Sequence, residues 1–319
     1  MTTALPPGAH GGDGARVARM LGVPVARVLD LSQSLNPLAS DPRPILERHL
    51  DAVGRYPDPE QATRALASRM GVDPERLLLT NGGAEAITIV ASIIGGSVQE
   101  PEFSLHPRGD GPRWRSNPHN PLGLLAPPDE RAAVWDEAFY PLATGHWTRG
   151  DEHSVVVGSL TKLLACPGLR IGYILADPSF IGACRRRQPA WALNGLACEA
   201  LADLLDALDL GASHAGVVRL RGQLGQVLAR HGLSARASDA NWLLVDAPGL
   251  RNALVAEAIV VRDCANFGLD GVVRIAVPDR EGLDRLEHAL ERLEARWADY
   301  EHMTVRNHDT KHERGESNE

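Results

Sequence analysis

Short apolar runs alternate with helical patterns along most of the chain, and this alternation restricts the fold more than any other feature of the sequence. The runs are short and rich in β-branched side chains, which is typical of strands that are covered on both faces. The runs before residue 180 are RLLLTNGG, GSVQEP, AAVWDEAF, SVVVGS and RIGYILA. They predict an α/β fold built on a largely parallel sheet.

The pattern changes after about residue 190. A leucine-rich helical stretch comes first, and NWLLVDA, AIVVRDC and GVVRIAV then alternate with helical segments. This order predicts a smaller α+β unit at the C-terminal end. We expect an N-terminal segment (1–50) that contributes to the small domain and the active site, a trimmed large domain (51–195), a small domain (196–297) and a disordered tail (298–319).

Composition excludes several classes of function. The net charge of −8 argues against general nucleic-acid binding. No apolar run approaches the roughly 20 residues that a membrane helix needs, and the N-terminus does not resemble a signal peptide, so we expect a cytoplasmic protein. The four cysteines are scattered and the twelve histidines show no metal-ligand spacing, so we expect reduced thiols and no metal.

Lysine is rare in this chain. Of 33 lysines and arginines only Lys162 and Lys311 are lysines, and Lys162 lies between two apparent strands. An arginine stays protonated, whereas an amine can lose its proton and form a Schiff base. Ser159 and Arg170 on either side suit a phosphate. A surface lysine at a strand-to-helix junction is the alternative, but a Schiff-base lysine beside a phosphate site suggests pyridoxal phosphate.

The segment SLTKLLACPGLRIGY resembles the lysine motif of fold-type I pyridoxal-phosphate enzymes of the class I and II aminotransferase family. Further matching motifs occur in family order from about residue 10 to residue 295. The most similar subgroup contains histidinol-phosphate aminotransferases and threonine-phosphate decarboxylases. The resemblance implies the fold-type I architecture and a homodimer.

The resemblance also implies which residues hold the cofactor. Lys162 would carry it covalently, and Asp136 in VWDEAF would pair with the pyridine nitrogen. Taken alone, Asp136 could equally be a strand-end carboxylate, and the glycine turn at residue 83 an ordinary strand-to-helix connection. The remaining cofactor residues implied are Gly83, Ala84, His106 (ring stacking), Asn120 (phenolic oxygen), Ser159, Arg170 and Tyr56 of the neighbouring subunit.

Arg274 in GVVRIAV matches the arginine that binds the substrate carboxylate, although an ion pair within the protein is an alternative. The decarboxylase subgroup has segments similar to AHGGD, DLSQSLNPL, PAWALNGLA and VVRDCANFGL. On that basis the substrate side would be lined by His10, Ser34, Asn36 and Asn194. Loop asparagines are, however, often turn formers.

Two segments of the expected large domain are short. Only PRGDGPRWR separates EPEFSLH from SNPHNPLG, and LLAPPDERAA replaces a helix before VWDEAF. A parallel crossover normally takes a dozen or more residues. We therefore expect a trimmed large domain, with a sheet edge or apolar face that could need a partner.

The sequence thus predicts a pyridoxal-phosphate enzyme acting on a small, phosphorylated amino acid. The preferred reaction is decarboxylation of L-threonine-O-3-phosphate to an aminopropanol phosphate, as in cobalamin biosynthesis. The alternatives are an aminotransferase of the histidinol-phosphate type and an inactive, trimmed scaffold or regulatory protein.

Overall fold

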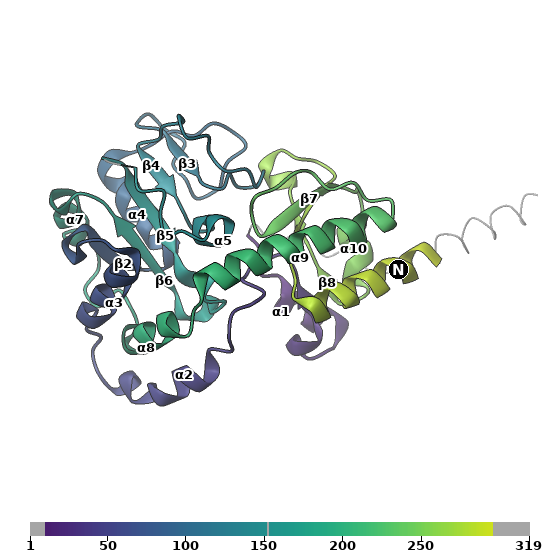
Figure 1. Cartoon of the computed structure of the whole chain (residues 1–319), viewed down its shortest axis with the longest axis horizontal. Coiled ribbons are helices and arrows are strands. Elements are labelled where there is room, and N and C mark those ends of the chain that lie inside the picture. The colour runs from purple at the N-terminus through teal and green to yellow at the C-terminus, as the bar shows by residue number, and fades with distance from the viewer. Residues whose placement is uncertain (1–9, 152, 296–319) are drawn as a thin grey trace, which may run out of the picture.

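A five-stranded sheet with the order β2-β6-β5-β4-β3 forms the centre of the larger part of the protein (Figure 1). The structure is a computed structural model that describes residues 10–151 and 153–295. The neighbouring strands β3, β4 and β5 are parallel, whereas β6 is antiparallel to both β2 and β5. Four of the five strands therefore run in one direction. The strands are β2 (Leu77–Asn81), β3 (Trp114–Ser116), β4 (Val134–Asp136), β5 (Val155–Ser159) and β6 (Ile171–Leu175).

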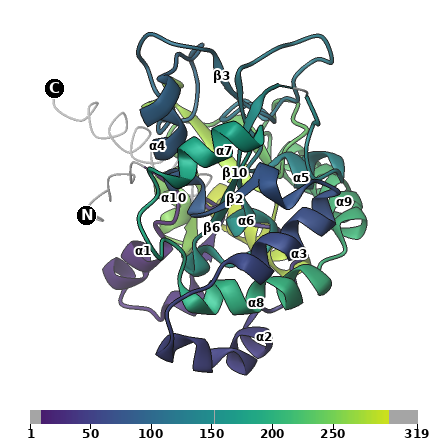
Figure 2. The same ribbon diagram turned by 90° about the vertical axis from the view of Figure 1, so that its left-hand side faces the viewer.

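Helices cover both faces of this sheet, which explains why its strands are apolar throughout. The helices α3 and α8 cover one face (Figure 2), and there Leu66 of α3 and Leu201 of α8 pack with Trp135. Val90 of α4 packs with Val134 on the other face. The covering helices are α3 (Glu60–Met70), α8 (Gly195–Asp206), α4 (Gly82–Ile94) and α7 (Pro178–Arg185).

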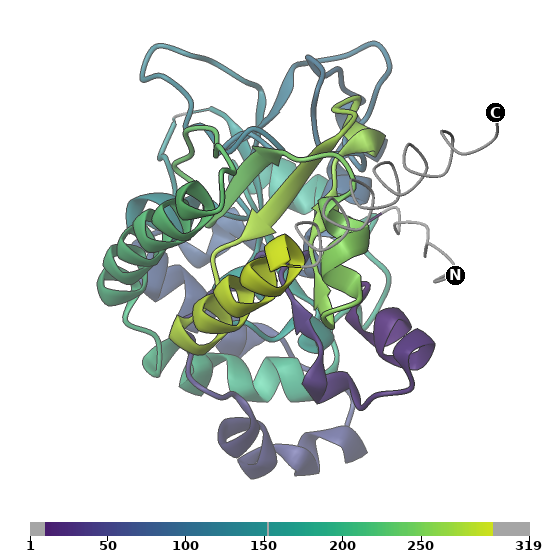
Figure 3. The ribbon, with the colours of Figure 1, turned by 90° about the vertical axis from the view of Figure 1, so that its right-hand side faces the viewer.

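A second unit contains an antiparallel sheet with the order β7-β10-β9 and a separate parallel pair, β1 with β8. A helix formed by residues 280–295, yellow in Figure 3, packs on this unit through Leu286 and Leu290. The elements of this unit are α1 (Gly14–Leu21), β1 (Leu29–Asp30), β7 (Trp242–Asp246), α10 (Leu250–Val255), β8 (Ile259–Val260), β9 (Arg262–Asp263) and β10 (Val272–Ala276).

The long helix α9 (Leu210–Arg230) belongs to both parts. Val217 lies in the core beside the large sheet, whereas Leu220 and Leu224 lie in the core of the second unit. The pairing of β1 with β8 joins the N-terminal segment to that second unit. The expected boundary between residues 195 and 196 stays a prediction, and the expected disordered tail lies outside the described residues.

Three shorter helices complete the structure: α2 (Arg43–Arg48), α5 (Tyr140–Thr144) and α6 (Leu160–Leu163). Within the part of the chain that is described, no helix is both long enough and apolar enough to cross a membrane.

The two short segments of the large domain fold as loops. No helix or strand forms between α4 and β3, or between β3 and β4, within residues 95–113 and 117–133. The expected strand GSVQEP is therefore wrong, because only Ser97 forms an isolated bridge, with Arg113. Two prolines, Pro101 and Pro107, follow this bridge, and proline cannot donate to a strand ladder.

In both loops an arginine side chain binds backbone carbonyl groups, which a helix or strand would otherwise pair. The guanidinium of Arg108 donates to the carbonyl oxygens of Glu102 (3.0 Å) and His106 (2.8 Å). The guanidinium of Arg149 donates to the carbonyl oxygens of Pro127, Pro128 and Glu130, each at 3.0 Å. Such loops carry carbonyl groups that no helix pairs, and a guanidinium with five donors can bind several of them.

The edge strand β3 is sealed, which means that its backbone groups bind other groups of the same chain. The backbone nitrogen of Trp114 donates to the carbonyl oxygen of Ser97, and that of Ser116 donates to the Glu102 carboxylate at 2.9 Å. The Ser116 carbonyl oxygen accepts from the Arg115 guanidinium at 2.7 Å. The trimmed edge therefore does not offer the free backbone ladder that the sequence suggested, because these groups already have partners.

Candidate active site

A cavity of about 660 Å³ lies where β4 and β5 end, between the large sheet and the second unit. Its lining comes from the N-terminal loop, the first turn of α4, the loop before β3, and strands β9 and β10. Many of the residues expected from the sequence line it: His10, Gly83, Ala84, Asn120, Asp136, Ser159, Lys162, Arg170 and Arg274.

Lys162 follows β5 on the short helix α6. Burial, and then the positive charges of Arg274 and Arg170, lower the pKa of Lys162 to about 8, while Asp30 opposes the shift. An amine with this pKa loses its proton readily near neutral pH, which is what a nucleophilic lysine requires. The backbone carbonyl of Lys162 accepts a hydrogen bond from the Asn36 nitrogen at 2.8 Å, which ties α6 to the N-terminal loop.

An anion cradle surrounds the first turn of α4. Gly83 and Ala84 at this helix start lie with Ser159 and Arg170 in the lining of the same cavity. A Cβ atom on Gly82 would lie 2.3 Å from the Arg170 guanidinium, and its φ of +75° also favours glycine. The glycine therefore lets the guanidinium lie against the helix start, where the backbone N–H groups already favour an anion.

Thr161 is a residue that the sequence analysis missed. Its hydroxyl is buried and has no hydrogen-bond partner among the described residues, and the side chain lines the cavity beside Lys162. Buried hydroxyl groups without partners are rare, so this group fits an absent phosphate oxygen. Its position directly before the lysine was the signal that could have identified it.

Asp136 ends β4, and its carboxylate is held from two sides. Oδ1 accepts from the backbone nitrogen of Ala138 at 3.0 Å, and Oδ2 lies 2.9 Å from Nε2 of His106. His106 is fully buried and does not line the cavity, so its expected role in ring stacking is wrong. The imidazole instead orients the aspartate, which lies in the lining and can face a cofactor.

Phe103 takes the place in the lining that was expected for His106. Its ring packs edge-on to His106, with 5.5 Å between the ring centroids. The loop that Arg108 fastens carries both side chains, and they point to different sides of it. The sequence could not distinguish them, because the two lie only three residues apart in an irregular segment.

Two buried arginines line the opposite wall. Arg274 of β10 donates to Oδ1 of Asn120 at 2.8 Å, and its guanidinium lies 4.8 Å from the centroid of the Trp242 ring. Arg262 of β9 is the register partner of Arg274 in the antiparallel sheet. Burial is the largest cause of a lowered pKa for both arginines. The pKa of Arg274 falls to about 10. Arg262 was not predicted, although it stands in the quoted segment VVRDCANFGL.

Three expected substrate contacts lie outside the lining, and two of them have structural roles. Asn36 is buried and donates to the carbonyl oxygen of Leu163 at 3.0 Å. Asn194 caps α8 by accepting from the Ala197 nitrogen at 2.8 Å. Ser34 is fully buried. The roles of Asn36 and Asn194 follow from the general preference of short polar side chains for caps and turns, and Ser32 and Gln33 line the cavity instead.

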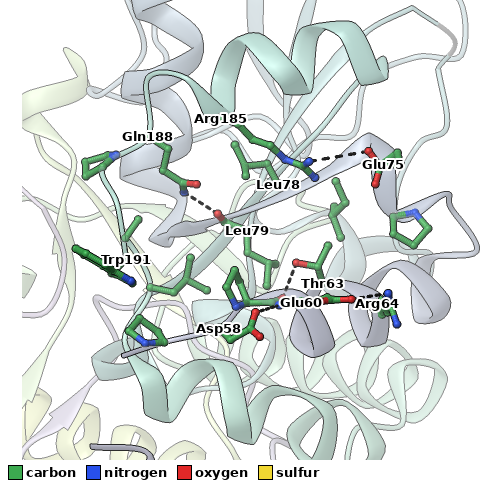
Figure 4. A pocket seen from close by; sticks show the side chains of 17 residues that line it. Asp58, Glu60, Thr63, Arg64, Glu75, Leu78, Leu79, Arg185, Gln188 and Trp191 are labelled. Atoms are coloured by element: carbon green, nitrogen blue, oxygen red, sulfur yellow. Dashed lines mark hydrogen bonds and ion pairs between the residues drawn. The ribbon is translucent and has the colours of Figure 1, made fainter. Parts of the chain in front are cut away.

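Tyr56 lies away from the cavity of its own chain. Its ring is 78% exposed and stacks on Trp191, which is 64% exposed, with 4.7 Å between the ring centroids. Trp191 lines a second cavity of about 540 Å³ whose other walls come from α3, β2 and the end of α7 (Figure 4). Two large aromatic side chains are thus presented together on the surface.

The geometry brings together an amine with a lowered pKa, an anion cradle, a buried carboxylate and two arginines. An amine can bind a carbonyl carbon covalently, and the cradle can hold a phosphate on the same molecule. The arginines can bind acidic groups of a second molecule. This arrangement suits a phosphorylated aldehyde cofactor and an anionic substrate.

Comparison with known proteins points to the same kind of cofactor. Residues 114–293 match the sequence model of the family described as aminotransferase class I and II. A histidinol-phosphate aminotransferase from Dechloromonas aromatica is 25% identical, over 86% of this chain and 92% of that protein. The threonine-phosphate decarboxylase of Salmonella typhimurium is 29% identical, over 88% of this chain and 95% of that protein.

Solved structures are similar over most of the chain. The L-threonine-O-3-phosphate decarboxylase of Porphyromonas gingivalis has a TM-score of 0.69 and 25% identity, and covers 82% of this chain and 98% of its own. The histidinol-phosphate aminotransferase of Sinorhizobium meliloti, solved with pyridoxal-5'-phosphate, has a TM-score of 0.73 and 16% identity, with 89% and 96% covered. The alignment to the Dechloromonas protein runs over 335 residues, longer than this chain of 319, so it must contain gaps in this chain.

Proposed function

Because this chain belongs to the class I and II aminotransferase family, we propose that it is a pyridoxal-phosphate-dependent decarboxylase of L-threonine-O-3-phosphate. The chain is an enzyme of the pyridoxal-phosphate class, and its relatives are aminotransferases and a decarboxylase. The choice of substrate and reaction is the proposal, and it rests on the two arginines that face the cavity.

The residues present fit the cofactor. Lys162 would hold it covalently, the first turn of α4 with Ser159, Thr161 and Arg170 would hold its phosphate, and Asp136 would hold a proton on the pyridine nitrogen. When bound, pyridoxal phosphate supplies a ring that accepts electrons from the substrate α-carbon. The cavity of about 660 Å³ is large enough for a cofactor and a small substrate together.

The paired arginines are the observation that carries the substrate assignment. Arg262 and Arg274 lie opposite each other in the register of β9 and β10, and both are at least nine-tenths buried. Like charges at directly opposite positions destabilise a sheet, and the charge of Arg262 contributes, after burial, to the lowered pKa of Arg274. An anionic substrate relieves that repulsion. Arg170 would serve the cofactor phosphate, and both of these guanidinium groups line the same cavity.

L-threonine-O-3-phosphate matches two guanidinium groups because it carries both a carboxylate and a phosphate. Arg274 is fixed by Asn120 and by Trp242, which suits the α-carboxylate that has to be oriented at the reacting carbon. Arg262 would bind the phosphate. Lys162 would also be placed to return a proton to the substrate carbon, since its pKa is lowered to about 8.

Transfer of an amino group from a histidinol-phosphate-type substrate is the second candidate. Several relatives are histidinol-phosphate aminotransferases, and one phosphate could occupy both arginines. An inactive scaffold that retains the cofactor fold is the third candidate, because the large domain is trimmed.

A homodimer is part of the proposal. Tyr56 and Trp191 form an exposed aromatic pair, and exposed apolar clusters of this kind often mark interfaces. In a homodimer of this family, Tyr56 of each subunit would reach the cofactor phosphate of the other. The cytoplasmic location stays a prediction.

Incubation of the holoenzyme with L-threonine-O-3-phosphate tests the reaction. Release of carbon dioxide supports the decarboxylase, whereas a stable change of the cofactor to its pyridoxamine form, without carbon dioxide, supports the aminotransferase. Neither change with this substrate or with histidinol phosphate would favour the scaffold. Unphosphorylated L-threonine is the matched control substrate.

Arg262→Ala tests the assignment of the phosphate. We expect kcat/KM for phosphothreonine to fall by roughly a hundredfold, because a charged hydrogen-bond partner is removed from a buried site. The affinity for pyridoxal phosphate should stay unchanged. Arg236→Ala, which removes an exposed arginine paired with Asp246, is the control. Equal losses with phosphothreonine and threonine would contradict the role of Arg262.

A further inference from the structure

We propose that Glu102 is a positioning residue that acts through His106 on Asp136. The three side chains form a buried row that begins at the sealed edge of the large sheet and ends at the cavity with Asp136. The inference rests on the use of pyridoxal phosphate by this family and on the proposed role of Asp136, but not on the identity of the substrate.

The distances define the order of this row of side chains. Nε2 of His106 lies 2.9 Å from Oδ2 of Asp136, and Nδ1 of the same ring lies 3.8 Å from Oε1 of Glu102. The exposed fraction of the side chain is 0% for His106, 1% for Glu102 and 10% for Asp136. A carboxylate therefore faces each nitrogen of one buried imidazole, and the aspartate is the end that reaches the cavity.

The imidazole has no alternative partner for its second nitrogen. Nδ1 of His106 makes no hydrogen bond within residues 10–151 and 153–295, so the nearby carboxylate is the anion available to hold a proton there. A histidine that is oriented at one nitrogen presents the other in a fixed direction, and removal of such an orienting carboxylate impairs enzymes in which the histidine itself stays in place. The geometry gives Glu102 that orienting position.

The hydrogen bonds of Glu102 engage both of its carboxylate oxygens. Its carboxylate accepts from the Ser116 nitrogen (2.9 Å), the Ser116 hydroxyl (2.7 Å) and the Phe103 nitrogen (2.8 Å). An amide has one acceptor oxygen and could not accept from all three donors, so Glu102→Gln also removes part of the bonding that seals β3. The imidazole nitrogens that lie within 4 Å of Glu102 in the described residues belong to His106 and His119.

The nearby arginines are engaged elsewhere. Arg115, which interacts electrostatically with Glu102, places its Nε 2.8 Å from Glu130, and Arg113 binds the same carboxylate at 2.6 Å. Arg108 binds Glu100 at 2.6 Å and holds the backbone carbonyl groups of the loop. These arginines thus have other carboxylate partners, and of the two imidazole rings beside Glu102, His106 is the one that contacts the cavity aspartate.

The placement of Glu102 also links two features of this chain. The residue seals β3 through Ser116, and Ser116 lines the cavity. Phe103, the next residue along the chain, lines the cavity as well. The loop that replaces the trimmed part of the large domain therefore supplies the groups that hold Asp136.

A double-mutant cycle on cofactor affinity tests the proposal. The dissociation constant of pyridoxal phosphate is measured by quenching of tryptophan fluorescence in apoprotein carrying Glu102→Gln, His106→Asn or both. We expect Glu102→Gln to weaken binding roughly tenfold, the size typical of outer partners of oriented histidines. In the His106→Asn background, Glu102→Gln should change the affinity by less than twofold, because its route to Asp136 is already broken.

Glu130→Gln is the matched control. Glu130 is a neighbouring, largely buried carboxylate that pairs with Arg113 and Arg115 and makes no contact with His106, so its removal should leave the affinity within twofold of wild type. Thermal unfolding of each apoprotein shows whether it is folded. If Glu102→Gln does not fold, Glu102→Asp, with its retracted carboxylate, replaces it in the same cycle.

Additive losses in the cycle would overturn the proposal, because they would mean that Glu102 acts only by sealing β3. Unchanged affinity in Glu102→Gln would also overturn it. No substrate is present in these measurements, so their outcome does not depend on whether the enzyme decarboxylates phosphothreonine.

Discussion

Lys162 should destabilise the apoprotein at neutral pH, so Lys162→Met should make it more stable. The pKa of Lys162 falls from 10.5 to about 8, first because of burial and then because of the nearby arginines. Each pKa unit corresponds to about 1.4 kcal/mol, so the buried ammonium costs about 3 kcal/mol of unfolding free energy at pH 7.

The sign of the pH dependence follows from proton binding. Between pH 8 and pH 10.5 the unfolded chain binds a proton at Lys162 that the folded chain does not, so the stability of wild-type protein rises with pH in this window. Below pH 8 both states are protonated and the cost is constant. The advantage of Lys162→Met should therefore fall from about 3 kcal/mol at pH 7 to less than about 1 kcal/mol at pH 10.

Urea denaturation of both apoproteins at pH 7 and pH 10 measures this difference. Groups other than Lys162 titrate in both proteins, so their contributions cancel in the comparison. A stability difference that is the same at both pH values would refute the reasoning, because it would come from packing rather than from the charge. No gain at pH 7 would refute it as well.

Three further changes test other parts of the structure. Arg149→Ala should lower the unfolding free energy, measured by urea denaturation, by about 3 kcal/mol, because three backbone carbonyls lose a charged donor. The exposed control Arg236→Ala should cost less than about 1 kcal/mol. Equal losses in the two variants would contradict this role of Arg149. Glu137→Gln should stabilise the protein at pH 8 more than at pH 5, because burial raises the pKa of Glu137 to about 7 and its charged form is costly at pH 8. Urea denaturation at the two pH values measures this difference. A gain in stability that is the same at both pH values would count against it. Phe103→Leu should weaken pyridoxal phosphate binding several-fold in fluorescence titration, since a ring in the lining is lost; unchanged affinity would exclude ring contact.

The cofactor side of the site could be predicted from the sequence because its residues lie in short continuous motifs. Lys162, Ser159 and Arg170 belong to one strand–helix–strand segment, whose spacing fixes their relative positions once the strands are recognised. The α/β fold followed in the same way, since apolar runs report strands that are covered on both faces.

Contacts between distant segments could not be predicted in this way. Asn36 and Asn194 have the residue type of a ligand contact, yet each binds a backbone group of a remote segment. Phe103 rather than His106 lines the cavity because the loop that carries them is irregular and is fixed by Arg108 rather than by a period.

By itself the sequence determined the layered fold and the lysine-centred chemistry, because periodicity and local spacing encode them. Only the tertiary structure decided that Arg262 stands beside Arg274, since their pairing depends on the register of two strands. It also decided that Glu102 seals the trimmed edge and reaches His106. Such roles depend on which buried groups meet, and burial is a property of the packed chain rather than of any segment of it.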